Sequence, residues 1–205
     1  MQGYIINMNR AREEDIVVTI LTQKSLDTLY RFYGARHGTI NLGFKIDFEI
    51  NTSLKSNIAQ LRDVIHIGFP WITDRDRLYH WQQFTSLFYR HLKDSEETGG
   101  FYFDLLDYAA SRWHLQNPKR VAIESYIKIL EYEGRLHKEM RCFFCEKPIK
   151  GDVSLIRSYF PAHPQCSHTP SVNQDALIEL FENQSSFFLD DREVERLWFV
   201  MAEGL

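Results

Sequence analysis

The strongest chemical signal in the sequence is a set of thiol and imidazole side chains arranged as two pairs. Two residues separate Cys142 from Cys145, two separate His163 from Cys166, and 17 residues lie between the pairs. Thiolate sulfur and imidazole nitrogen are ligands that Zn²⁺ prefers, and two such pairs can surround one ion tetrahedrally. Because four protein ligands leave no position for water, we expect a structural Zn²⁺ site rather than a catalytic one.

Two alternatives to this assignment remain open. Three buried cysteines without a metal are also compatible with a stable core, because a free cysteine behaves as a small apolar residue. His168 is a rival fourth ligand, although the single residue between Cys166 and His168 makes a poorer pair than His163 with Cys166. An odd number of cysteines, in a chain that opens without a secretion signal, favours a metal over disulfides.

The elements that must position these residues fall into two regions, and the first is rich in strand-forming residues. Runs of Ile, Val, Phe and Tyr occur at 3–9, 15–22, 26–34, 40–50 and 61–69. Every second residue from Phe44 to Ile50 is apolar, which is the pattern of a strand with one buried face. Five short strands predict a small closed or partly closed barrel such as an OB-fold, because closure removes exposed sheet edges.

After Pro70 the hydrophobic period changes to about 3.6, which predicts helices. Thr73 with Asp76 resembles a capping box, and Asn117 before Pro118 is typical of a helix start. Further helices are expected at 97–115, 174–183 and 190–202. We therefore predict an α+β fold: an OB-fold domain at 1–70, an α-helical domain at 71–141 and 169–205, and an inserted zinc-binding module at 142–168.

Composition and charge narrow the function classes. With 44% hydrophobic residues among 205, the chain can bury a core, and no apolar run approaches the roughly 18 residues of a membrane span. The net charge of −4 gives no overall support for nucleic-acid binding. The acidic excess is concentrated in residues 141–205, which carry ten Asp/Glu and six Lys/Arg. Residues 1–80 carry nine Asp/Glu and ten Lys/Arg. We expect a cytoplasmic protein without a membrane partner.

A run of aromatic and basic residues around the end of the third predicted strand suits an unpaired nucleic-acid strand, because bases stack on aromatic rings and cations follow the phosphates. The candidate DNA-binding residues are Tyr30, Arg31, Tyr33, Arg36 and His37, extended by Lys45, Lys55 and Arg62. Strand alternation places Tyr30 and Phe32 on one face and Arg31 and Tyr33 on the other. The alternative is that Tyr30 and Phe32 belong to the barrel core and Arg31 is a solvated charge.

A second basic set lies beside Trp113 and Pro118. Arg112, Lys119 and Arg120 could bind an acidic, apolar peptide tail, or they could be solvated charges at helix ends. The common nucleotide-binding and hydrolase motifs do not occur in the sequence. We therefore expect a binding protein and not an enzyme.

Several segments occur in an order that is known from one family. Near the start, residues 3–6 read Gly-Tyr-Ile-Ile, and residues 13–22 run from an acidic turn to a strand that ends in Leu-Thr. A Gly-Ala-Arg stretch follows at 34–36, and the Cys and His pairs come after the central helices. In this order the segments resemble the bacterial RecO family of recombination mediators. Many members of that family carry four cysteines in the zinc site, and this sequence has His163 in place of one of them.

The resemblance implies a non-catalytic DNA repair protein that is cytoplasmic and associated with the nucleoid. RecO-like proteins bind single- and double-stranded DNA, anneal complementary strands and join the ring-forming partner RecR. They also engage the acidic C-terminal tail of single-stranded-DNA-binding protein and so help RecA to load. An alternative from another class is a zinc-ribbon OB-fold adaptor that binds protein or RNA and has no part in recombination. A nuclease is disfavoured, because the expected metal shell is full.

Overall fold

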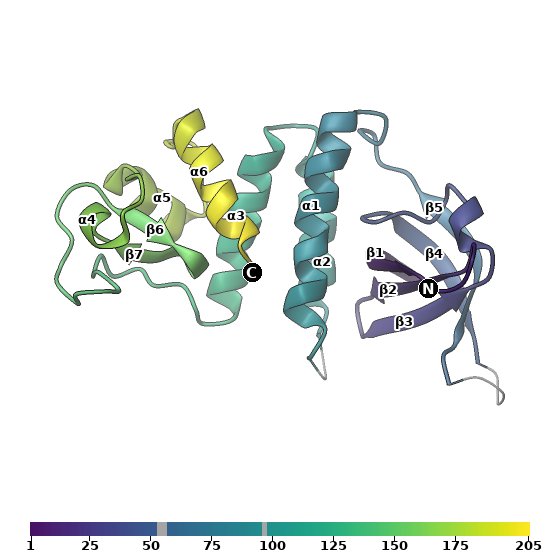
Figure 1. Cartoon of the computed structure of the whole chain (residues 1–205). Helices are drawn as coiled ribbons and strands as arrows, with labels where there is room; N and C mark the ends of the chain where they lie inside the picture. The colour runs from purple at the N-terminus through teal and green to yellow at the C-terminus, as the bar shows by residue number, and fades with distance from the viewer. Residues whose placement is uncertain (53–56, 96–97) are drawn as a thin grey trace. The chain divides into compact units, whose positions relative to one another are not determined.

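The computed structural model describes residues 1–52, 57–95 and 98–205, and these form two compact units (Figure 1). The first unit, Met1–His114, contains five strands and the helices α1 and α2. The second unit, Leu115–Leu205, contains α3 to α6 and a two-stranded sheet. The predicted division into a barrel, a helical domain and a zinc module stays a prediction.

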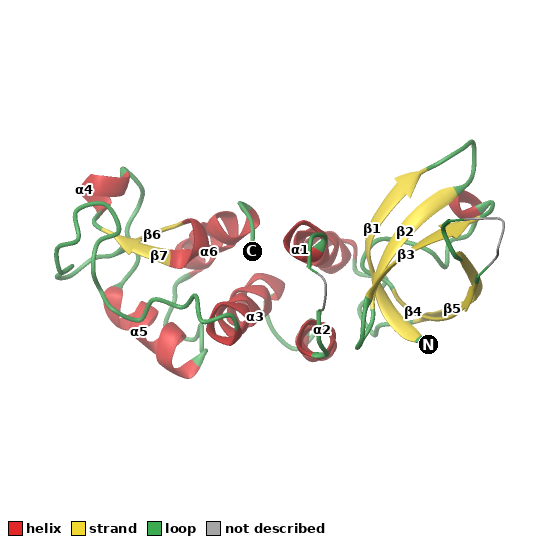
Figure 2. Cartoon of the chain, turned by 90° about the horizontal axis from the view of Figure 1, so that it is seen from below, coloured by secondary structure: helices red, strands yellow, loops and turns green. Residues whose placement is uncertain are grey.

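The N-terminal strands close into a barrel, as the sequence pattern predicted (Figure 2). The strands are β1 (Gln2–Arg10), β2 (Ile16–Leu21), β3 (Leu26–Arg31), β4 (Lys45–Asn51) and β5 (Gln60–Ile67). Their order around the barrel is β1-β2-β3-β5-β4, and β4 returns to pair with β1. The β3–β5 pair is parallel and the others are antiparallel. This is an OB-like five-stranded barrel.

The barrel core follows from period-two alternation. Phe44, Ile46 and Phe48 are buried, whereas Glu49 is exposed, so the alternation predicted for this segment is confirmed. The other buried residues of the same core are Ile5, Ile16, Val18, Ile20, Leu29, Ile40 and Leu61. Residues 41–44 form a turn in which the Phe44 N–H donates to the Asn41 carbonyl, so β4 begins later than the apolar run.

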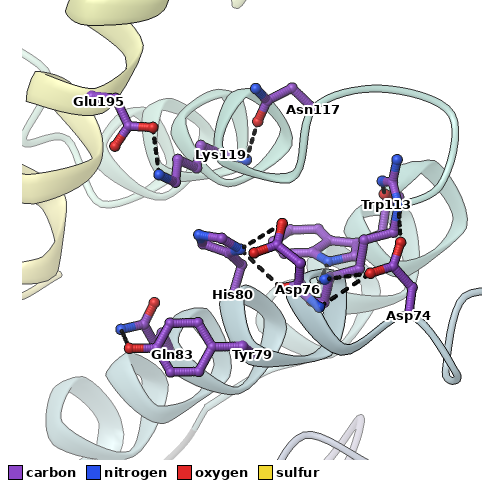
Figure 3. Close-up of polar contacts among 10 residues, drawn as sticks. Asp74, Asp76, Tyr79, His80, Gln83, Trp113, Asn117, Lys119 and Glu195 are labelled. Carbon is purple, nitrogen blue, oxygen red and sulfur yellow. Dashed lines mark hydrogen bonds and ion pairs between the residues drawn. The ribbon is translucent and has the colours of Figure 1, made fainter.

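Helices α1 (Arg75–Leu92) and α2 (Phe101–Arg112) complete the first unit, and Figure 2 shows both nearly end-on. The N-cap of α1 is Asp74 and not Thr73: its side chain accepts hydrogen bonds from the backbone N–H groups of Asp76 and Arg77 (Figure 3). A carboxylate is a strong N-cap and also interacts favourably with the helix dipole. Asp74 therefore caps the helix in place of Thr73.

A cluster of aromatic rings joins α1 to the barrel. Trp81 is fully buried and donates its indole N–H to the Gly43 carbonyl at 2.7 Å. Its ring lies 6.0 Å from that of Tyr4 on β1 and 5.0 Å from that of Trp113. The indole of Trp71 donates to the Ala110 carbonyl at the end of α2, at 3.0 Å. This aromatic cluster therefore packs α1 and the end of α2 against β1 of the barrel.

The second unit is built on α3 (Pro118–Tyr132), α5 (Gln174–Asn183) and α6 (Asp191–Ala202). The predicted starts of α3 and α6 are confirmed. The Asn117 side chain caps α3 with Pro118 in its first turn, and Asp190 and Glu193 form a capping box on α6. The α3 face from Val121 to Leu130 is buried, so this helix is central to the unit.

Between α3 and α5 the chain forms a small β-rich module. It contains β6 (Ser154–Ile156), the 3₁₀ turn η2 (Arg157–Tyr159), β7 (Phe160–Ala162) and the short helix α4 (Pro164–Ser167). Tyr159 is buried and donates its hydroxyl to the Leu197 carbonyl of α6 at 2.9 Å, which ties the module to the helices. No helix within the described part of the chain has both the length and the apolar character needed to cross a membrane.

Candidate nucleic-acid interface and metal centre

The acidic turn between β1 and β2 holds the aromatic segment at the end of β3. Asp15 accepts a hydrogen bond from the Tyr30 hydroxyl at 2.6 Å and another from the Tyr33 backbone N–H at 2.8 Å. The Ala35 N–H donates to the Glu14 carbonyl at 2.9 Å, and the Glu14 carboxylate pairs with Arg36. The turn therefore positions the loop, and it also compensates the charge of Arg36.

This arrangement turns two aromatic rings outward. Phe32 is 47% exposed and Tyr33 is 60% exposed. The predicted strand alternation ends at Arg31, because β3 stops there and Tyr33 adopts a left-handed backbone with φ 54°. A side chain at Gly34 would place its Cβ 2.4 Å from the side chain of Ile16 at the start of β2, so only glycine fits at this position. The alternative in which Phe32 belongs to the barrel core is wrong.

The exposed rings border a shallow hollow that collects several of the predicted DNA-binding residues. The hollow measures about 290 Å³ and is lined by Arg31, Phe32, Tyr33, His37, Leu61 and Arg62. Arg31 is half-buried and donates to the Leu61 carbonyl at 3.0 Å, so it joins β3 to β5 and is not a freely solvated charge. Arg62 is exposed, with its guanidinium 2.7 Å from Gln60 Oε1. The hollow thus combines cations with aromatic faces.

Phe32 also borders a second hollow of about 370 Å³, so its ring stands between the two. The lining of this second hollow includes Arg12 and Tyr30. The Phe32 and Tyr30 rings meet edge-to-face at 5.0 Å. Phe32 and Arg12 were not among the residues selected from the sequence; the aromatic run already contained Phe32, whereas no sequence signal pointed to Arg12.

One further residue of the predicted groove, Lys45, is placed differently. Lys45 makes an ion pair with Asp107 of α2 at 2.7 Å, and its side chain is only 14% exposed. The ammonium also lies 5.0 Å from the centre of the Phe103 ring. We therefore remove Lys45 from the proposed DNA-binding surface. Lys55 lies outside the described residues.

Replacing Asp15 with asparagine tests whether the turn holds the loop. The Tyr30 hydroxyl and the Tyr33 N–H lower the pKa of Asp15. A carboxyl group with a lowered folded-state pKa stabilises the protein above its unfolded pKa, near 4, and this contribution is lost as the pH falls through the folded value. We expect Asp15→Asn to be less stable than wild type at neutral pH, with the difference shrinking in acid, as measured by urea unfolding. An equal difference at all pH values would contradict this.

The second basic set is largely engaged within the protein. Lys119 pairs with Glu195 of α6 (Figure 3). Arg120 donates to the carbonyls of Ser186 and Leu189 and pairs with Asp191. Arg112 belongs to the first unit, where its guanidinium lies 5.4 Å from the Tyr108 ring centre. An acidic tail that bound Lys119 would therefore have to displace Glu195.

The Cys and His pairs come together in the second unit. The ligand atoms of Cys142, Cys145, His163 and Cys166 all lie within 4.8 Å of one another. The His163 Nδ1 atom is 3.4 Å from the Cys145 sulfur and 3.9 Å from the Cys166 sulfur. His163 completes this cluster, whereas His168, the rival ligand, caps the far end of α4.

The spacing of the donors fits one tetrahedral ion. Zn–S bonds of about 2.3 Å and Zn–N bonds of about 2.0 Å place neighbouring ligand atoms roughly 3.5–3.8 Å apart. The sulfur–nitrogen distances of 3.4 and 3.9 Å lie close to this range. Three thiols and one imidazole are also the donor set of a structural zinc site. The cluster is therefore consistent with a zinc site.

Backbone N–H groups around the cluster favour the thiolate form of Cys142, which is the form that binds a cation. Burial raises the pKa of Cys142, but the N–H groups of His163, Cys145 and Phe144 donate to its sulfur and together lower that pKa. Burial and the sulfurs of Cys142 and Cys145 raise the pKa of Cys166. Three thiolates at this separation repel one another, and a divalent cation removes that repulsion.

A tight turn brings the first ligand pair to the second. The Cys142 N–H donates to the Lys147 carbonyl and the Glu146 N–H donates to the Cys142 carbonyl, which closes the turn. The Phe143 N–H donates to the carbonyl of Pro161, which lies within β7, at a distance of 2.8 Å. The ligand pair at 142–145 is thereby held against the strand that leads to His163.

The fold and the two sites define an OB-like barrel protein with a helical C-terminal part that carries a Cys₃His cluster. Residues 1–72 match the family model described as RecO N terminal. The barrel therefore matches the N-terminal domain of the RecO family, which is the family that the sequence segments resemble. A search of the curated proteins gives no match.

Proposed function

We propose that this protein is a recombination mediator that binds DNA without making or breaking a covalent bond. The RecO N-terminal domain over residues 1–72 carries the proposal. It is supported by the hollow in which the Phe32 and Tyr33 rings lie beside Arg62 and His37. In this role the protein binds single- and double-stranded DNA and anneals complementary strands in the cytoplasm, at the nucleoid.

The chemistry of the barrel surface suits an unpaired strand. Base–aromatic stacking contributes roughly 1–3 kcal/mol per base, and the exposed Phe32 and Tyr33 offer two such faces. Arg62 supplies a cation beside them for the phosphates. Such binding displaces counterions, so we expect the affinity to fall steeply with salt.

The proposed partners follow from the family. They are RecR, the acidic C-terminal tail of single-stranded-DNA-binding protein and, indirectly, RecA. The candidate tail-binding residues are Arg112 and Lys119, with Glu195 as the internal competitor for Lys119. Arg120 is no longer a candidate, because it donates to the carbonyls of Ser186 and Leu189.

We also propose that Cys142, Cys145, His163 and Cys166 hold a structural Zn²⁺. The ion supplies four bonds that fix the module between α3 and α5. With all four positions filled by side chains, the ion has no open position at which it could contact DNA.

Strand annealing tests the proposal directly. Wild-type protein is expected to accelerate annealing of complementary oligonucleotides at low salt, alone or with RecR. In Arg62→Glu we expect at least several-fold weaker binding to single-stranded DNA, with a slope of log affinity against log salt that is shallower by about 0.7, because one phosphate contact is lost. Binding is measured by fluorescence anisotropy across a salt series.

The matched control is Arg75→Glu, which makes the same charge change on an exposed residue in the first turn of α1. This variant is expected to bind like wild type. Equal losses in both variants would move the binding surface away from the hollow. A wild-type protein that neither binds nor anneals DNA, with or without RecR, would leave the zinc-ribbon adaptor as the better proposal.

A further inference from the structure

We infer that the metal-binding module carries a second binding site, which takes an unpaired base of a single-stranded polynucleotide. The site lies on the ligand turn at Phe143 and Phe144 and on the adjacent face of Phe160, far along the sequence from the matched barrel domain. The inference relies on the proposed function for its ligand, single-stranded DNA, but not for its location.

The first observation is a set of aromatic rings that the structure leaves open to solvent. Phe143 and Phe144 are each 55% exposed, although they lie in the sequence between Cys142 and Cys145, whose sulfurs both point into the metal cluster. Their rings meet edge-to-face at 5.6 Å, and Phe143 lies 5.0 Å from Phe160. Hydrogen bonds fix the backbone of the turn, so the rings are presented on a rigid support. Exposed aromatic surface on a rigid turn indicates a contact with another molecule.

The second observation is that this surface already holds a flat heteroaromatic ring. The His137 imidazole stacks on Phe160 with a centroid distance of 4.4 Å and an interplanar angle of 29°. A nucleobase is also a flat heteroaromatic ring and can stack in the same way. A hollow of about 520 Å³ lies here, and its lining includes the rings of His137, Phe143 and Phe160, the cations Lys138 and Arg141, and the carboxylates Glu139 and Glu146. This volume falls within the range of small-molecule sites, roughly 300–1,000 Å³.

The third observation is the local charge. Residues 137–150 carry four cations, Lys138, Arg141, Lys147 and Lys150, and two carboxylates, Glu139 and Glu146. Residues 174–203 of the same unit instead carry eight acidic and two basic residues. Lys138 pairs with Glu131 at 3.0 Å, so the cations available beside the exposed rings are Arg141, Lys147 and Lys150. Cations beside exposed rings suit the phosphates and bases of one strand, whereas the acidic part of the unit repels them. The ligand is therefore an unpaired nucleotide and not an acidic peptide.

Replacing both rings of the turn tests the site in the full-length, zinc-containing protein. In Phe143→Ala/Phe144→Ala we expect at least a fivefold loss of affinity for a labelled oligothymidylate, the effect of losing a single stacked base. The salt dependence should be unchanged, because no cation is removed. Affinity for the duplex should change less than twofold, because paired bases are already stacked. The conservative Phe143→Tyr/Phe144→Tyr variant should retain wild-type affinity.

The chain offers a matched control in a second exposed aromatic pair. Phe187 and Phe188 meet at 5.2 Å and 85°, much like Phe143 and Phe144, but they lie in the acidic part of the unit. Phe187→Ala/Phe188→Ala should bind single strands like wild type. Zinc content near one per chain in every variant shows that the module is folded.

The outcomes separate this inference from the proposed function. If wild type binds no single-stranded DNA, the proposed function fails and this inference fails with it. If wild type binds but Phe143→Ala/Phe144→Ala with full zinc binds equally well, only the second site is wrong. An equal loss in both alanine pairs overturns the site as well, because it shows a general effect of exposed rings.

Discussion

Replacing Cys142 with alanine is expected to abolish zinc binding and to unfold residues 141–168 while the barrel stays folded. Cys142 is the buried member of the cluster, and three backbone N–H groups lie around its sulfur. Structural zinc sites in small modules contribute on the order of 10 kcal/mol, which exceeds what the few buried apolar side chains of this module, such as Val153 and Leu155, would supply alone. Zinc per chain and amide hydrogen exchange across 141–168 measure the effect, and a chelator should reproduce it in the wild type.

The two histidines provide the matched comparison. His163→Ala should also lose the metal, whereas His168→Ala should retain about one zinc per chain, because His168 is not a member of the cluster. Full zinc and unchanged exchange protection in Cys142→Ala would mean that the cluster is an unmetallated set of thiols. Retention of zinc in His163→Ala with loss in His168→Ala would exchange the roles of the two imidazoles.

Replacing Trp81 with alanine is expected to lower the free energy of unfolding of the first unit by about 3–5 kcal/mol. The substitution removes a fully buried ring, its contacts with Tyr4 and Trp113, and the hydrogen bond to the Gly43 carbonyl. A Cβ at Gly43 would lie 2.7 Å from the Trp81 ring, so the neighbouring backbone is fitted closely to this side chain. Urea unfolding followed by circular dichroism measures the change.

Tyr79 is the control on the same helix, because its ring is exposed and no part of the aromatic core. Tyr79→Ala should cost no more than about 0.5 kcal/mol. Similar losses for the two variants would mean that α1 is stabilised by its own helix propensity and not by its packing on the barrel.

Features that depend on neighbouring residues could be predicted from the sequence. Alternation over Phe44–Ile50 predicted the buried face of β4, and Asn117-Pro118 and Asp190 predicted the starts of α3 and α6. Ligand spacing predicted the metal cluster, because two short turns are enough to bring each pair together. The cap of α1 was misplaced by one residue, since Thr73 and Asp74 are both good N-caps and only the backbone geometry decides between them.

Features that depend on distant partners could not be predicted. Lys45 has the alternation of a solvated residue, but a carboxylate 62 residues away in α2 pairs with it. Arg120 was a candidate for an acidic partner, but it binds carbonyls of the loop before α6. The aromatic segment 30–33 was divided between two faces on the assumption of a continuous strand, and the left-handed Tyr33 ends that strand. Charge and ring exposure in this protein are decided by the tertiary fold.

The contacts of Asp107 determine where this protein can be truncated, because this residue lies beyond the segment that matches the family model. Its carboxylate accepts from the Tyr4 hydroxyl at 2.6 Å and from the Lys45 ammonium at 2.7 Å, although Asp107 lies 35 residues beyond the matched segment, which ends at residue 72. A fragment ending there would leave a phenol and an ammonium of the barrel wall without their acceptor. The segment that matches the family model is thus shorter than the segment that the barrel needs for its polar contacts. A truncated protein that keeps the barrel intact has to extend through α2.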